Sequence, residues 1–180
     1  GFELIGGTFV EAVSVCHIEH DGPLFEDACL AEAKWVADQC SQSKLSYQIV
    51  ATGPLESPKW PSLFAQLQKI PNVCGIRQIL NHEPSWPRNH RLGNLLDSNN
   101  WQQGFSTLAE AGYSFELQCN PHQYKQAAQI FQRNSKIPVI LNHLGTPKRE
   151  DLLEGQKYWE GMQALASLEQ VSIKLSMLTY

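Results

Sequence analysis

Short apolar runs rich in β-branched residues alternate with longer runs of helical spacing along the whole chain. The short runs predict strands, because four to eight apolar residues bounded by turn residues are typical of buried strands. Amphipathic runs between them predict helices that cover the strands. The six predicted strands span residues 10–18, 47–51, 73–80, 114–118, 138–141 and 171–175.

Helix boundaries are marked by capping residues at several places. Ser57 followed by Pro58 predicts a helix start, and Asn120 followed by Pro121 repeats the signal. Gly112 fits the left-handed position just past a helix end. The predicted helices therefore cover residues 25–42, a segment from Ser57 to about residue 70, residues 101–111, a segment from Asn120 onwards, and residues 158–168. A long loop is expected over residues 81–100.

Strict alternation of strands and helices predicts an α/β fold with a parallel sheet. A (β/α)8 TIM barrel is preferred, here incomplete, with about strands two to seven in one domain over residues 1–180. A doubly wound open sheet also fits the alternation. However, no G-x-G-x-x-G or G-x-x-x-x-G-K-[ST] loop follows any strand, which excludes the usual nucleotide-binding versions of that fold.

Composition narrows the class of partner. The net charge is −4, and no cluster of Lys and Arg occurs, which argues against nucleic acid or an anionic membrane as partner. The five cysteines are odd in number and form no Cys-x-x-Cys pair. Reduced, buried thiols in a cytoplasmic protein are therefore expected rather than disulfides or a structural zinc site.

Polar side chains collect where the predicted strands end. Five of the six histidines lie there, with only His90 inside the long loop. Because active sites of parallel α/β folds form at the carboxyl ends of the strands, this enrichment indicates a functional rim. The candidates here are His17 and Glu19, which share one strand parity and so point the same way, together with Gln118 and Ser176. If His17 and Glu19 point into the barrel mouth they can bind a polar substrate, whereas if they point outward they meet the helices, and the inward direction is favoured because buried charge is costly.

Two cations stand inside apolar strands. Arg77 in GIRQIL and Lys174 in SIKLS each need a partner or a wet cavity. A substrate carboxylate is one partner, because a guanidinium binds it in a bidentate fork. An internal salt bridge, to a strand acid such as Glu116, is the alternative. Trp86 and Arg88 in the long loop are candidates for a lid over the substrate, or for plain loop packing.

His143 is the sharpest single position. It follows a buried strand directly and precedes Gly145, which permits close approach. Neutral imidazole there could ligate a metal, polarise a carbonyl or act as general base. The alternative is a structural histidine that caps the next helix.

Several segments together resemble the amidohydrolase-related family, which includes the 2-pyrone-4,6-dicarboxylate lactonase and L-fuconolactonase types. These segments are GIRQIL, the FELQ strand followed by Pro121 and Gln123, LNHLGTP and IKLS, and they cover nearly the whole chain in consistent order. The resemblance implies a (β/α)8 barrel that hydrolyses a lactone or related ester by attack of an activated water. It makes His143 the catalytic histidine at the metal position or scissile carbonyl. Arg77 becomes the substrate-binding arginine, with His17 and Glu19 on the neighbouring rim.

Members of the family differ in metal use. A divalent metal, zinc for preference, held in part by His143, is therefore one alternative, and catalysis without a metal is the other. This sequence also departs from the family pattern. It has no His-x-His pair, and it lacks the Asp in a G-[ST]-D-x-P context that serves as general base on the last strand. We therefore expect a fragment or truncated homologue of a small-molecule hydrolase, with little or no lactonase activity on its own.

Two other functions stay open. One is a metal-dependent decarboxylase of the same superfamily. The other is a non-catalytic module that binds sugar acids or lactones without turning them over. In all three cases the two unpaired parallel edges of an incomplete barrel predict self-association.

Overall fold

A computed structural model describes residues 1–12, 25–85, 92–153 and 155–177 of the chain. Six strands form one sheet in chain order, and every neighbouring pair is parallel. The strands are β1 (Gly6–Val10), β2 (Ser46–Thr52), β3 (Val73–Ile79), β4 (Ser114–Gln118), β5 (Val139–Leu141) and β6 (Val171–Ile173). The parallel order confirms the α/β prediction from the alternation of the sequence.

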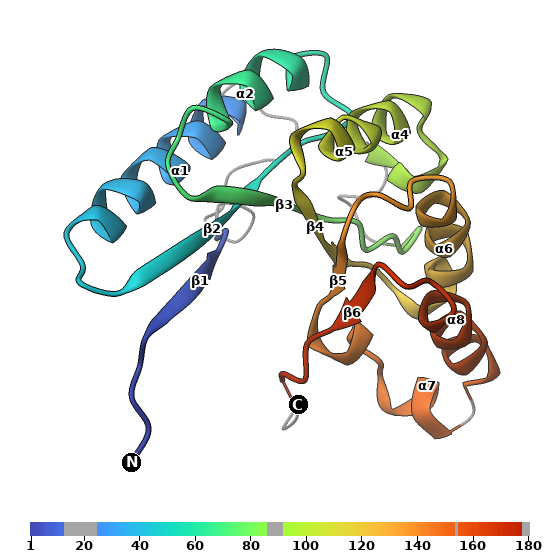
Figure 1. Cartoon of the computed structure of the whole chain (residues 1–180). Coiled ribbons are helices and arrows are strands. Elements are labelled where there is room, and N and C mark those ends of the chain that lie inside the picture. Colours follow the sequence, from blue (N-terminus) through green and yellow to red (C-terminus); the bar gives the residue numbers. More distant parts are fainter. Residues whose placement is uncertain (13–24, 86–91, 154, 178–180) are drawn as a thin grey trace.

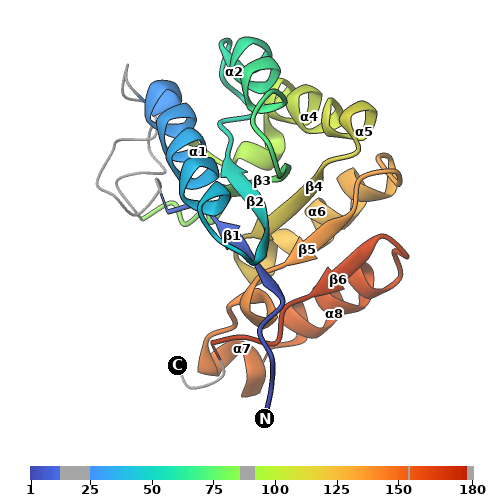
Figure 2. The same cartoon turned by 60° about the vertical axis from the view of Figure 1, so that its left-hand side comes forward.

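The helices connect consecutive strands and lie in an arc along the outer side of the curled sheet (Figure 1). They are α1 (Phe25–Ser41), α2 (Trp60–Leu67), α4 (Asn99–Ser106), α5 (Leu108–Ala111), α6 (Tyr124–Gln132), α7 (Arg149–Leu153) and α8 (Gln156–Ala166). The second view shows the same layering, with the strands inside the arc of helices (Figure 2). The chain thus builds a curled half-barrel.

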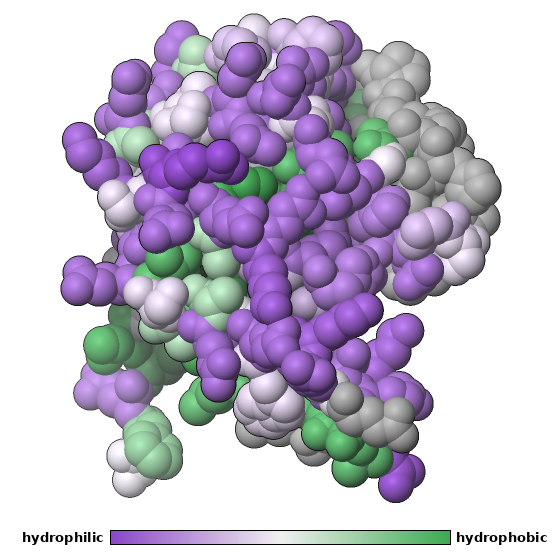
Figure 3. Space-filling model, turned by 90° about the vertical axis from the view of Figure 1, so that its right-hand side faces the viewer, coloured by the Kyte–Doolittle hydropathy of each residue, from purple (hydrophilic) through white to green (hydrophobic). Residues whose placement is uncertain are grey.

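The main core lies between the sheet and the helices. Phe115 of β4 meets Phe105 of α4 edge-on at 5.3 Å between ring centroids, and Phe105 stacks on Trp101 at the same distance. All three rings are fully buried. The outer surfaces of α4, α6 and α8 are mostly hydrophilic, as expected where helices face water (Figure 3). Within the described ranges we find no helix with the length and apolar character needed to cross a membrane.

Most helix predictions are confirmed, and the differences have local causes. Gly112 is left-handed with φ of 68°, as the sequence indicated. The helix expected from Ser57 instead begins at Trp60, because Ser57 Oγ closes a short turn by accepting from the Lys59 amide at 3.1 Å. The helix expected over residues 101–111 is two helices, α4 and α5, and the long loop ends two residues early at the start of α4.

The first strand was misplaced by the sequence analysis. It was expected over residues 10–18, of which 13–18 lie outside the described residues, whereas β1 spans Gly6–Val10. Its position follows from pairing with β2, where Gly6 lies opposite Ser46 and Val10 opposite Val50. Two glycines hid this strand, since glycine is rare in strands. The last strand is also shorter than expected and ends at Ile173.

Candidate active site

A row of polar side chains crosses the inner face of the sheet. Thr52 pairs with Arg77, and Arg77 pairs with Glu116 on the next strand. Residues directly paired across parallel strands project to the same face, so the three side chains lie side by side. Their face is opposite to the one on which Phe115 and Leu117 pack, because alternate residues point to opposite sides. Arg77 and Glu116 therefore lie on the inner side of the half-barrel.

Glu11, one residue beyond β1, binds two neighbouring members of this row, Thr52 and Arg77. Arg77 Nε donates to Glu11 Oε1 at 2.7 Å, and Arg77 Nη2 donates to the Glu11 carbonyl oxygen at 3.1 Å. The Thr52 hydroxyl donates to Glu11 Oε2 at 2.7 Å. Arg77 thus has the internal salt bridge that the sequence analysis held as an alternative, although its acid is Glu11 and not Glu116.

Glu116 instead pairs with Lys174, which follows β6. The ammonium Nζ lies 2.6 Å from Glu116 Oε2. In both pairs the acid is the more deeply buried partner. The side chains of Glu11 and Glu116 are 0% and 4% exposed, against 12% for Arg77 and 32% for Lys174. The positive partners therefore face the solvent-accessible space, and the negative partners lie beneath them.

His143 lies two residues beyond the end of β5 and close to these cations. Its Nδ1 lies 2.9 Å from Ser176 Oγ, which joins the ends of β5 and β6. Burial lowers the pKa of His143, and the charges of Arg77 and Lys174 lower it further, while Glu116 raises it less. The imidazole is therefore held in its neutral form near neutral pH. A neutral ring that donates from Nδ1 to Ser176 leaves Nε2 as a proton acceptor.

The backbone at His143 is in an uncommon conformation. His143, Leu144 and Thr146 have φ of 52°, 53° and 51°, and Gly145 between them has 82°. The left-handed region costs a non-glycine residue roughly 1–2 kcal/mol. Such strain persists only where surrounding contacts hold it, and it is typical of functional sites. We call residues 143–146 the left-handed turn.

A buried donor precedes this turn. Asn142 is 1% exposed, and its Nδ2 has no acceptor within the described part of the chain. Its main chain is fully used, because the amide donates to the Leu117 carbonyl and the carbonyl accepts from the Gly145 amide. An unpaired buried donor is costly, so Asn142 is a candidate to bind a group at this strand end.

The rim beside β3 and β4 is held by amide side chains. Gln123 is 2% exposed and donates from Nε2 to the Leu80 carbonyl and to Asn94 Oδ1. Its Oε1 accepts from the amides of His82 and Asn120. His82 and Asn120 therefore serve as loop scaffold through their main chains. The cap predicted at Asn120, with proline after it, is present, and it takes the form of a capping box with Gln123.

The remaining predicted site residues divide into two groups. Gln118 ends β4 on the same face as Glu116, one step nearer the carboxyl end, and is half-buried. Ser176 contacts His143 as described. His17, Glu19, Trp86 and Arg88 lie outside the described residues.

The described residues do not fit a divalent metal at His143. Among them, no three His, Cys, Asp or Glu side chains come close enough together to hold an ion. Catalytic zinc sites use three protein ligands, and the two cations beside His143 would repel a further positive charge. The acids that could offset this repulsion, Glu11 and Glu116, are already paired with Arg77 and Lys174.

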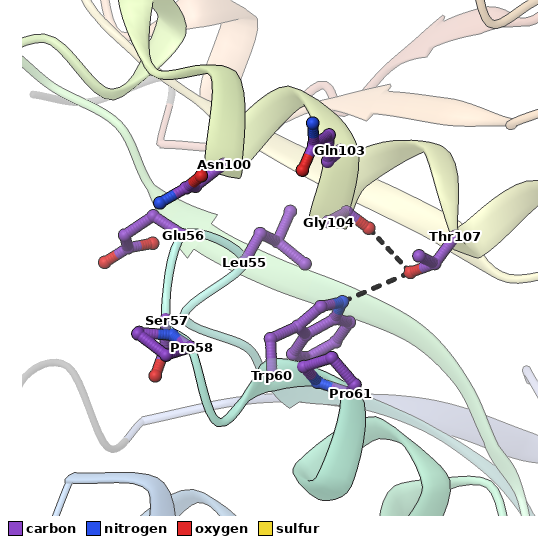
Figure 4. A pocket seen from close by; sticks show the side chains of 10 residues that line it. All are labelled: Leu55, Glu56, Ser57, Pro58, Trp60, Pro61, Asn100, Gln103, Gly104 and Thr107. Atoms are coloured by element: carbon purple, nitrogen blue, oxygen red, sulfur yellow. Dashed lines mark hydrogen bonds between the residues drawn. The ribbon is translucent and has the colours of Figure 1, made fainter.

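A separate groove lies on the outer side, between α2 and α4 (Figure 4). Its volume is about 460 Å³, and Trp60 forms one wall, with its indole Nε1 donating to Thr107 Oγ1 at 3.1 Å. Burial raises the pKa of Glu56 at its edge. None of the groove's lining residues belongs to the polar row or to the left-handed turn.

Sequence reasoning missed three residues that shape this site. Glu11 was placed inside a longer strand, so its role as the Arg77 partner was not foreseen. Tyr124 and Tyr158 were not singled out as site residues, yet both donate hydrogen bonds to carbonyls of the left-handed turn. The pairing of buried tyrosines with a distant turn leaves no local pattern in the sequence.

Comparison with known proteins gives a consistent family. A family model described as Amidohydrolase matches residues 21–180. The uncharacterized protein y4mH of Sinorhizobium fredii is 26% identical over 150 residues, which cover 81% of this chain and 49% of that protein. The chain thus spans about half the length of the curated relative it matches.

Solved structures agree on the fold. An amidohydrolase of Burkholderia multivorans with bound zinc aligns with a TM-score of 0.64 at 20% identity, over 82% of this chain and 49% of that one. A probable 2-pyrone-4,6-dicarboxylic acid hydrolase of Acinetobacter baumannii with citric acid bound aligns with a TM-score of 0.62 at 18% identity, over 96% and 55%. These comparisons confirm the predicted resemblance and the incomplete TIM-barrel fold.

Proposed function

Because this chain belongs to the Amidohydrolase family, we propose that it carries part of the active site of a hydrolase acting on a lactone or related carboxylic ester. The substrate class is a small polar molecule with at least one carboxylate, such as a sugar acid or dicarboxylate. His143 is the proposed catalytic residue. Arg77, Lys174, Ser176 and Gln118 form the proposed substrate-binding side, with His17, Glu19, Trp86 and Arg88 as further candidates.

One observation carries this proposal. A neutral imidazole lies beside two cations whose counter-acids are buried beneath them. The exposed side of the cluster is therefore positive, which favours a carboxylate or a developing oxyanion. Burial, and after it the charges of the same cations, lowers the pKa of His143, so the neutral ring can accept a proton at neutral pH.

The chemistry follows from these positions. His143 Nε2 accepts a proton from water as the water oxygen attacks the carbonyl carbon. The resulting oxyanion is stabilised by Lys174, and Asn142 Nδ2 can donate to the same oxygen. When the intermediate collapses, the ester C–O bond breaks, and the imidazolium returns its proton to the leaving oxygen. No step uses a metal.

The substrate class is also supported by a structural neighbour. That neighbour is the probable 2-pyrone-4,6-dicarboxylic acid hydrolase of Acinetobacter baumannii, and citric acid is bound to it. Citrate is therefore a suitable probe for the proposed site. We expect slow or no turnover by the 180-residue chain itself, since it has neither a His-x-His pair nor a G-[ST]-D-x-P segment.

Calorimetric titration of the 180-residue chain with citrate tests the proposal. We expect saturable binding of citrate by the unmodified chain. The double variant Lys174→Met with Glu116→Gln removes the Lys174–Glu116 pair, and we expect it to bind citrate about tenfold more weakly. The reason is that a charge-assisted hydrogen bond contributes roughly 1.5–3 kcal/mol. The matched control is Lys125→Met with Glu160→Gln, which removes an exposed Lys–Glu pair on α6 and α8. Equal affinity in both double variants would contradict the assignment.

A binding module without catalysis is the second candidate. It is favoured because the sequence has no G-[ST]-D-x-P segment, whereas the polar row of Thr52, Arg77 and Glu116 is present on the inner face of the sheet. Incubation with a lactone panel separates the two functions. Ring opening above the buffer rate that disappears in His143→Asn supports the hydrolase. Citrate binding without ring opening supports the module, and release of carbon dioxide would favour a decarboxylase.

A further inference from the structure

Two buried tyrosines from different helices converge on the left-handed turn that holds His143. The Tyr124 hydroxyl of α6 donates a hydrogen bond to the Gly145 carbonyl. The Tyr158 hydroxyl of α8 donates to the Leu144 carbonyl at 3.0 Å. The two ring centroids are 6.2 Å apart. Two consecutive carbonyls of the left-handed turn are therefore held by hydrogen bonds from helices α6 and α8.

The turn needs such contacts, because its own backbone bonds are few. Inside it, the Thr146 amide donates to the His143 carbonyl at 2.8 Å, and the Gly145 amide donates to Asn142 at 2.8 Å. The Leu144 amide donates to the Lys174 carbonyl at 3.0 Å, which ties the turn to the end of β6. Three of its four residues are not glycine, and their left-handed conformation is disfavoured without external support.

Packing leaves Tyr124 little freedom. A Cβ on Gly145 would collide with the Tyr124 hydroxyl and lie 2.9 Å from its Cζ. On the other side, a Cβ on Gly161 of α8 would lie 2.7 Å from Tyr124 Cβ. Tyr124 is thus enclosed between the turn and α8 and is fully buried. Gly145 at φ 82° serves both the backbone conformation and this close contact.

Burial keeps both hydroxyls as donors. It raises the pKa of Tyr124 and of Tyr158 above that of an ordinary phenol, and Asp151 adds to both shifts. Neither phenol therefore ionises near neutral pH, so both hydroxyls remain hydrogen-bond donors there.

We propose that Tyr124 and Tyr158 are positioning residues for His143, acting by pinning the carbonyls of residues 144 and 145 so that the imidazole stays on Ser176. A role of the two tyrosines in catalysis rests on the proposed function. Their role in fixing the position of the turn and of His143 does not. The hydroxyls touch the backbone one and two residues beyond His143. Their effect therefore passes through the turn to the ring, and from the ring to Ser176.

Tyrosine-to-phenylalanine variants test this inference, since each removes a hydroxyl and keeps the ring. The set is Y124F, Y158F and the double variant. Tyr113→Phe is the matched control, because Tyr113 is a buried tyrosine whose ring contacts Phe64 instead of the turn. Y158F is the mildest change and keeps the test valid if Y124F does not fold.

The deciding readout is the tautomer of His143, followed by long-range proton–nitrogen NMR on the full 180-residue chain. We expect one dominant tautomer in the unmodified protein and in Tyr113→Phe. In Y158F and the double variant we expect a mixture, together with citrate binding weakened about threefold to tenfold. Loss of stability alone, with the single tautomer retained, would show an ordinary structural role and overturn the inference.

The same data separate this inference from the proposed function. A tautomer that changes in Y158F while citrate fails to bind the unmodified protein supports the pinning and contradicts the function. Citrate binding that is unchanged in Y158F, with an unchanged tautomer, contradicts the pinning and leaves the function supported.

Discussion

At the scale of single residues, the site depends on two ion pairs in which the acid is buried and the cation is more exposed to solvent. Glu11 and Glu116 are buried on the inner face and hold Arg77 and Lys174 in place. His143 stays neutral because it is partly buried and faces two positive charges. The pKa of His143 therefore depends on the charges of Arg77 and Lys174, so removal of either cation should raise this pKa.

Stability should fall in acid because of His143. Its folded-state pKa lies below the ordinary histidine value, so the unfolded chain binds the proton more tightly. The contribution of neutral His143 to stability is fully present above the pKa of histidine in the unfolded chain. It is lost as the pH falls from that pKa through the lower pKa of His143 in the folded protein. The charged groups facing the ring are Arg77, Lys174 and Glu116.

Urea unfolding from about pH 8 down to about pH 5 measures this loss, since the ordinary histidine pKa is about 6.5. His143→Asn should flatten the curve in this range, and asparagine tolerates the left-handed backbone. If the free energy of unfolding of the unmodified protein and of His143→Asn fell in parallel with pH, His143 would be excluded as the cause of the acid destabilisation.

Removal of the buried acid should be costly. Glu11→Gln leaves Arg77 without a counter-charge in a site where the acid is 0% exposed. Breaking one side of a buried pair costs about 3 kcal/mol. The control is Lys59→Met, whose pair with Glu26 is 62% exposed on the lysine side and should contribute less than about 1 kcal/mol. If the urea midpoint fell equally in both variants, the buried Glu11–Arg77 pair would contribute no more to stability than the exposed Lys59–Glu26 pair, contrary to this prediction.

At the scale of elements, α6 and α8 form the support for the left-handed turn. Gly161 lets α8 approach Tyr124 closely, since even a methyl group there would meet Tyr124 at 2.7 Å. Tyr124 and Tyr158 then reach the turn from these two helices. The geometry of the site is thus set by helix packing as well as by the strands.

Gly161→Ala should therefore destabilise the protein in spite of a better helix propensity. Alanine gains about 1 kcal/mol in a helix interior. Overpacking against a fully buried tyrosine costs about 1–3 kcal/mol, so we expect a net loss of about 1 kcal/mol. Gln163→Ala on the exposed face of α8 is the control and should change the unfolding free energy little. A Gly161→Ala protein as stable as the original would contradict the close packing.

The sequence predicted what depends on local pattern. Gly112 and the Asn120 cap were placed correctly, because both act within a few residues of themselves. His143 was found at its strand end for the same reason. The partner of Arg77 could not be predicted, since Glu11 is 66 positions away and its choice over Glu116 depends on the register of three strands. The strand at Gly6–Val10 was missed because tertiary pairing, not propensity, forms it.

At the scale of the whole molecule, the sheet has two edge strands. Among the residues that the structure describes, β1 pairs only with β2 and β6 pairs only with β5. Apolar side chains lie at these edges, with Ile5 82% and Ile173 39% exposed. An uncovered strand edge is a template for pairing with another chain. Self-association through these edges is therefore expected.

Lysines at both edges should reduce that association, because edge charges oppose strand pairing. Ile5→Lys with Ile173→Lys should shift the mass measured by light scattering after size exclusion towards the monomer. Trp35→Lys, which charges an exposed site on helix α1 and not on an edge strand, should not. An unmodified protein that is monomeric at every concentration would contradict the expectation.

The central claim is that Arg77, His143 and Lys174 form one binding site for a small carboxylate. Chemical-shift mapping of the 180-residue chain during a citrate titration tests it most directly, because each residue reports separately. We predict that the largest changes fall on these three residues and on Ser176 and Asn142. Changes confined to the groove at Trp60 and Thr107, or no saturable changes, would contradict the account.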